Sequence, residues 1–185
     1  MQVKGTGIKT TKEFVKSNFP DLFQSWINAL PEKSKALYKQ TVEFSEWFPI
    51  REAYLDPVDK MIEICYNNKV KEGAEALGQF SAEYALKGIY KVFILVASPQ
   101  FLMKRSTKIM TTFYEPCKIE VDETSKQSVN LRITKFDNLN TAIEYRIGAW
   151  CQKALEMANC KEVEYKIEKS LLRNDKETLI SFKWN

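Results

Sequence analysis

Residues 72–90 carry the pattern that most constrains how this chain can fold. They read EGAEALGQFSAEYALKGIY, a helical pattern that contains glycine at positions 73, 78 and 88. Each glycine inside a helix costs about 0.5–1 kcal/mol relative to alanine, so the fold must gain something in return. Small residues recur at helical spacings and form a low ridge along this segment: Ala74, Gly78, Ser81, Ala82, Ala85 and Gly88.

Two interpretations of this ridge are open, and they do not exclude each other. In the first, the small residues allow the backbone of a second helix to approach closely. In the second, the missing side chains leave an apolar cavity that a small molecule fills, with a few polar groups from Ser81, Tyr84, Tyr90 and Trp150. The candidate ligand-binding residues are Ala74, Gly78, Ser81, Tyr84, Ala85, Gly88 and Trp150.

The first part of the chain, residues 1–115, is predicted to be mainly helical. Prolines and capping residues divide it into segments with helical apolar stripes. We expect Thr11, Asp21 and Asp56 to cap three of these helices, and a brief strand to lie within residues 41–50. The predicted helices span residues 12–19, 21–30, 31–40, 57–68, 70–97 and 99–115.

Residues 116–185 have a different pattern, which predicts a ββαββ unit. CKIEVDE and SVNLRITKF alternate and are rich in β-branched residues, as are the segments on either side of Asn174 and Asp175. A helix capped by Asn138 or Asn140 is expected between these two hairpins and extends to about residue 159. The predicted fold class is α+β, a single domain over residues 1–185 with helices packed on an antiparallel sheet.

The most informative count is that of histidine, which is absent from all 185 residues. Its absence removes the usual general base and the common zinc and haem ligand. The four cysteines contain no C-x-x-C pair, and the net charge of +4 is too small to indicate nucleic acid. Neither an apolar run of transmembrane length nor a secretory signal is visible, so a cytoplasmic location with reduced thiols is expected.

Several segments resemble a known superfamily, which unites haem nitric-oxide-binding domains, 4-vinyl-reductase-type domains and TRAPP vesicle-tethering subunits. They are EWFPIREAY, EALGQFSAEYALKGIYK, ASPQFLMKRSTKIM and ISFKW, and within the superfamily they are most similar to an uncharacterised bacterial family. The segment IEYRIGAWCQKALEMANCKEVEYKI also resembles the end of TRAPP subunits. The resemblance implies an apolar cavity between helices and sheet that holds haem, a lipid chain or another hydrophobe.

The resemblance also bears on cofactors and function. Haem sensors of the superfamily use a proximal histidine and a Y-x-S-x-R element, and this sequence has neither, so we expect no cofactor. The predicted function is a non-catalytic ligand-binding or sensory protein that holds an apolar small molecule and signals to a protein partner. The alternative is a ligand-free dimeric scaffold resembling TRAPP subunits. A third possibility is an enzyme that uses lysine or carboxylate chemistry.

Overall fold

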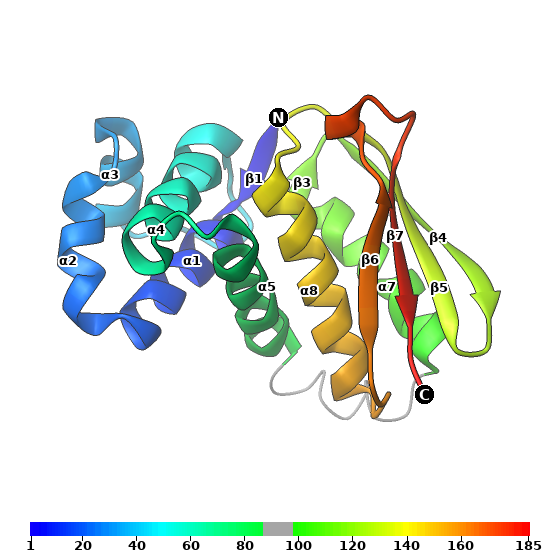
Figure 1. The fold of residues 1–185 in the computed structure, drawn as a ribbon. Coiled ribbons are helices and arrows are strands. Elements are labelled where there is room, and N and C mark those ends of the chain that lie inside the picture. Colours follow the sequence, from blue (N-terminus) through cyan, green and yellow to red (C-terminus); the bar gives the residue numbers. More distant parts are fainter. Residues whose placement is uncertain (87–97) are drawn as a thin grey trace.

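A computed structural model describes residues 1–86 and 98–185 of the chain. Figure 1 shows helices α1–α4 gathered away from a four-stranded sheet, with α5 and α8 between them and the sheet. The helices are α1 (Gly5–Asn18), α2 (Pro20–Ala29), α3 (Glu32–Lys39), α4 (Asp56–Tyr66), α5 (Val70–Leu86), α7 (Pro99–Phe113) and α8 (Thr141–Met157). The strands are β1 (Gln2–Lys4), β2 (Trp47–Pro49), β3 (Tyr114–Glu115), β4 (Cys117–Ser125), β5 (Ser128–Phe136), β6 (Glu164–Lys169) and β7 (Thr178–Lys183). A π-helix η1 (Arg51–Leu55) precedes α4, and a 3-10 turn η2 (Leu171–Arg173) precedes β7.

The larger sheet confirms the predicted ββαββ unit and the α+β class. Its strand order is β4-β5-β7-β6, and every pair is antiparallel. Alternate residues of the central strands β5 and β7 are fully buried, because α7 and α8 pack on that face of the sheet. These buried residues are Val129, Leu131, Ile133, Ile180 and Phe182.

A second sheet, which the sequence did not predict, has the order β2-β1-β3. It joins the N-terminus to the segment that follows α7, with Val3 opposite Phe48 on one side and Tyr114 on the other. The strand β2 confirms the brief strand predicted within residues 41–50, whereas β1 and β3 are only three and two residues long, too short for a pattern of alternation to identify them. This small sheet brings Val3 and Tyr114 to one side of the site described below.

The helix α5 packs most extensively against α8, and its small residues allow the close approach. A Cβ atom added to Gly78 would lie 2.5 Å from the carbonyl oxygen of Arg146 and 3.0 Å from Cβ of Ala149. Ala74 and Leu77, on the same side of α5, are fully buried. At Gly78 the ridge therefore serves close helix packing, which was the first of the two interpretations.

The three predicted caps at Thr11, Asp21 and Asp56 are wrong. Thr11 is buried inside α1, because that helix begins at Gly5, where the backbone packs against the carbonyl of Glu43. Asp21 lies in the first turn of α2 and caps nothing. Asp56 continues the helical turns of η1 into α4 and pairs with Arg51 at 3.3 Å.

Other predicted boundaries are confirmed. Asn140 caps α8, with its Oδ1 accepting from the backbone N–H of Ile143 at 2.8 Å. α4 ends at Asn67 and Asn68, which both adopt positive φ angles. The predicted helix over 70–97 is confirmed to Leu86, and its remainder lies outside the described residues. Within residues 1–86 and 98–185, no helix combines the length and apolarity needed to cross a membrane.

We predict that Gly78→Ala destabilises the protein by about 1–3 kcal/mol, because the new methyl group would press on the backbone of α8. Helix propensity alone favours alanine over glycine by about 1 kcal/mol and would make Gly78→Ala more stable. A loss of stability would therefore come from the contact with α8. Urea denaturation measures the change. The matched control is Gln79→Ala at the adjacent exposed position, which should change stability by less than about 0.5 kcal/mol. A Gly78→Ala variant as stable as the parent would refute the close contact.

Candidate functional site

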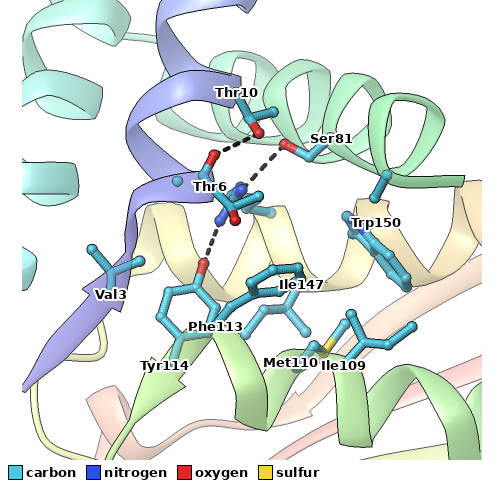
Figure 2. Close-up of a pocket in the computed structure, with 13 residues that line it drawn as sticks. Val3, Thr6, Thr10, Ser81, Ile109, Met110, Phe113, Tyr114, Ile147 and Trp150 are labelled. Carbon is cyan, nitrogen blue, oxygen red and sulfur yellow. Dashed lines mark hydrogen bonds between the residues drawn. The ribbon is translucent and has the colours of Figure 1, made fainter. Parts of the chain in front are cut away.

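A pocket lies where β1, α1, α5, α7 and α8 meet (Figure 2). The space between its walls is about 50 Å³, which is room for a few water-sized molecules. The walls are mostly apolar, with hydroxyl groups from two threonines, a serine and a tyrosine. The lining residues are Val3, Thr6, Gly7, Thr10, Ser81, Ala85, Ile109, Met110, Phe113, Tyr114, Arg146, Ile147 and Trp150.

Arg146 brings a positive charge into this apolar pocket from α8. Its Nη1 donates to the hydroxyl of Tyr114 and its Nη2 to Ser81 Oγ at 3.1 Å, as the dashed lines of Figure 2 mark. The guanidinium carbon lies 4.7 Å from the ring centre of Tyr54, a cation–π distance. Three side chains thus hold the guanidinium plane in one orientation.

No carboxylate among the described residues forms an ion pair with Arg146. Burial lowers the pKa of Arg146, but Tyr114 and Tyr54 together raise it by more. The pKa therefore lies above its ordinary value, and the guanidinium stays charged. Its Nε is buried and has no hydrogen-bond partner in the described part of the chain. A charge held away from bulk water without a counter-ion is costly unless something else compensates it. Two hydroxyl groups and the ring of Tyr54 compensate this half-buried charge in part, and the Nε atom is the donor left for a further partner.

Two side chains in the pocket carry atoms that can bind a metal-containing cofactor. They are the phenol of Tyr114 and the thioether of Met110, both of which are buried. The pKa of Tyr114 is raised, because the effect of burial exceeds the opposing effect of the neighbouring Arg146, so the phenol keeps its proton in the ligand-free protein. In residues 1–86 and 98–185 no cluster of three or more acidic or cysteine side chains could hold a bare metal ion.

The structure brings three of the seven predicted ligand-binding residues into this pocket. Ser81, Ala85 and Trp150 line it. Ala74 and Gly78 lie away from it, within the packing of α5. The side chain of Tyr84 is exposed and stacks on Phe80, with ring centres 6.0 Å apart. Gly88, like Tyr90, lies outside the described residues.

The sequence prediction missed Arg146, the central residue of the site. A signal was present, because Ile143, Arg146, Ile147 and Trp150 occupy the i, i+3, i+4, i+7 positions of one apolar helix face. A charge in the middle of such a stripe points toward the interior. Tyr114 and Met110 gave no comparable signal, because only the tertiary structure brings α7 and β3 beside α8.

No protein-family model matches the chain, and no curated protein matches it. Solved structures do match. An H-NOX (haem nitric-oxide-binding) protein from S. oneidensis in the Fe(II)NO state is 10% identical, with a TM-score of 0.74, over 98% of this chain and 99% of that one. A histidine-to-glycine mutant of an H-NOX domain from Shewanella oneidensis, in the Fe(II)CO state, is 10% identical with a TM-score of 0.72, over 98% of both chains.

A third similar structure concerns the modulation of haem redox potential through protein-induced porphyrin distortion. It is 12% identical with a TM-score of 0.65, over 98% of this chain and 95% of that one. These neighbours contradict the expectation of no cofactor, which rested on the missing histidine. One of them is a histidine-to-glycine mutant in the Fe(II)CO state. The described helices, strands and topology, matched over nearly the whole chain, show that this protein has the H-NOX fold.

Proposed function

We propose that this protein is a non-catalytic ligand-binding domain that holds haem in the pocket beside Arg146 and signals its occupancy through α7. The observation that carries the proposal is the guanidinium of Arg146, which lines an apolar pocket without a carboxylate partner among the described residues. Haem combines a flat apolar ring with carboxylates, so it matches both the walls and the charge. The H-NOX neighbours are haem proteins, which supports the same choice.

The donor set in the pocket fits haem without a histidine. Arg146 would pair with a haem carboxylate through its unpartnered Nε. Tyr114 would bind the iron through its oxygen after losing its proton to solvent, and Met110 is the second candidate, since tyrosine and methionine both serve as haem ligands. Bound haem would supply an iron centre to which NO or CO can bind, as in the two Shewanella oneidensis structures.

The size of the pocket links binding to a change in α7. Ligand pockets usually hold about 300–1,000 Å³, whereas the described walls enclose about 50 Å³. A haem therefore has to displace side chains that line the pocket, and three of the lining residues, Ile109, Met110 and Phe113, belong to α7. The opposite face of α7 is exposed around Lys108 and Thr111. Binding would stabilise one position of α7, and a partner contacting the exposed face would detect it.

The alternative of a TRAPP-like dimeric scaffold has no support from the fold neighbours described above, which are H-NOX proteins. A homodimer and a cytoplasmic location both stay predictions. A catalytic role gains no support from the pocket, in which the described side chains include neither a general base nor an activated nucleophile.

The direct test is titration of the purified protein with ferric haem and with dithionite-reduced haem, followed by Soret absorbance and native mass spectrometry. We expect saturation at one haem per chain. In Arg146→Met the affinity should fall about tenfold or more, because the carboxylate loses its partner. Arg51→Met is the control, since Arg51 is exposed and does not line the pocket, and its affinity should equal that of the parent. Absence of one-to-one binding, or equal affinity in Arg146→Met, would overturn the proposal.

Substitution of Arg146 should lower the affinity for haem without lowering the stability of the ligand-free protein. We predict that the free energy of unfolding of Arg146→Met stays equal to that of the parent or rises by about 1 kcal/mol, because an unpaired charge is removed from the interior. Urea denaturation without haem measures this. A loss of more than about 2 kcal/mol would instead make Arg146 a structural residue.

The iron donor can be identified independently. Tyr114→Phe should shift the Soret band of the ferric complex and lower its affinity, because the phenol oxygen is lost while the ring keeps its packing. Met110→Leu should leave the spectrum of the ferric complex unchanged, since it preserves volume and removes only the thioether. A Soret band that shifts in Met110→Leu but not in Tyr114→Phe would show that Met110 binds the iron.

A further inference from the structure

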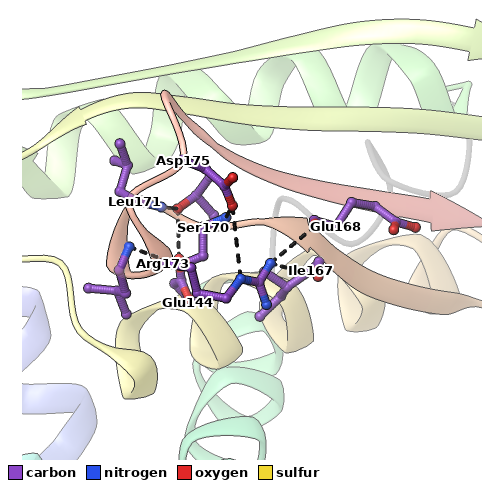
Figure 3. A network of polar contacts seen from close by, with 9 residues as sticks. Glu144, Ile167, Glu168, Ser170, Leu171, Arg173 and Asp175 are labelled. Carbon is purple, nitrogen blue, oxygen red and sulfur yellow. Dashed lines mark hydrogen bonds and ion pairs between the residues drawn. The ribbon is translucent and has the colours of Figure 1, made fainter.

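A second charged group on α8 lies on the other side of the helix from Arg146. Glu144 is only 4% exposed, and its Oε1 accepts hydrogen bonds of 2.6 Å from both Ser170 Oγ and Thr178 Oγ1. Figure 3 shows Glu144 directly beneath Ser170, at the turn that joins β6 to β7. The carboxylate thus connects the start of α8 to the edge of the sheet.

The two hydroxyl groups are oriented to donate to the carboxyl group of Glu144. Ser170 Oγ accepts from the backbone N–H of Leu172, and Thr178 Oγ1 accepts from that of Leu171, each at 3.0 Å. Since their lone pairs are used in this way, their protons are free to point at Glu144. Both hydrogen bonds end on Oε1, and in the described part of the chain no donor reaches Oε2.

Glu144 has no cationic partner among the described residues, although cations surround it. Lys71 lies 3.9 Å from Glu75, and Lys166 lies 2.9 Å from Glu168. Arg173 lies 3.9 Å from Asp175 and also donates to the backbone carbonyl of Glu168 at 3.1 Å (Figure 3). Each of these cations already faces another acceptor. The unmatched charge at this place is the carboxylate of Glu144.

This carboxylate lines a pocket of about 390 Å³, formed by α5, the first turns of α8, β6 and η2. Two aromatic rings, those of Tyr145 and Tyr165, also line it. The ring of Tyr165 is fixed in place, because it lies against Gly148 and its hydroxyl donates to Glu75. Lys71 already places its ammonium 5.8 Å from the ring centre of Tyr145, which shows that a cation is accommodated beside this ring.

We propose that this pocket binds a small organic cation that carries a primary ammonium group. The ammonium would donate to Glu144 Oε2, the oxygen without a described donor, and the organic part would lie against the rings of Tyr145 and Tyr165. A bare metal ion does not fit, because Glu144 is not part of any group of three or more possible ligands among the described residues. The site is separate from the haem pocket, so either proposal can fail without the other.

The test uses phenethylammonium chloride and its neutral counterpart phenethyl alcohol, titrated into the ¹⁵N-labelled protein and followed by two-dimensional NMR. We expect saturable shifts of the amides of Tyr145, Tyr165 and Ser170 with the ammonium compound. The alcohol should bind at least about tenfold more weakly, because it lacks the charge that Glu144 requires. This comparison uses the unmodified protein and is independent of how any variant folds.

Two variants localise the effect. Glu144→Gln keeps an oxygen to accept from Ser170 and Thr178 but removes the charge, and it should weaken phenethylammonium binding at least about tenfold. Glu164→Gln, at an exposed position at the start of β6, should bind like the parent. No saturable binding below about 10 mM, equal binding of the alcohol, or equal affinity in a folded Glu144→Gln protein would each overturn the proposal. Glu144 would then serve only to anchor the β6–β7 turn.

Discussion

The close contact between α5 and α8 fixes the position of the side chains that these two helices bring to both pockets. At Gly78 the backbone of α5 approaches the carbonyl of Arg146, and no side chain fits between them. Because the carbonyl in contact belongs to Arg146 itself, the packing that requires glycine also fixes where the guanidinium enters the pocket. A shift of α8 would move Arg146 away from Ser81, which lies one turn further along α5.

The same helix carries two charges to opposite sides. Arg146 faces an apolar pocket and Glu144 faces a more polar one, and neither has a partner of opposite charge within the described residues. Natural cores rarely keep such charges unless they are compensated. Hydroxyl groups and aromatic rings compensate them in part here, and a bound ligand would complete the compensation. The same unpaired charges would then lower the stability of the ligand-free protein and bind the ligands.

How far the sequence predicted the structure can be followed in particular elements. The hairpins and α8 were predictable because their patterns are long and Asn140 supplies a local cap. The caps at Thr11 and Asp56 failed for a tertiary reason, since α1 starts early against Glu43 and η1 continues into α4. Of the residues that line the pocket, Ser81 and Ala85 were predicted from their helical spacing and Trp150 as a polar group, whereas Arg146 was missed although its position within an apolar stripe gave a signal.

The sequence by itself determined the order and type of most elements, the small residues that allow α5 to approach α8, and the absence of histidine. These properties are local, because they depend on residue type and on spacing along one segment. Only the tertiary structure decided that Tyr114, Ser81 and Arg146 meet, and that Ser170 and Thr178 converge on Glu144. Those contacts join residues from 26 to 65 positions apart, and no local pattern encodes which distant groups share a pocket.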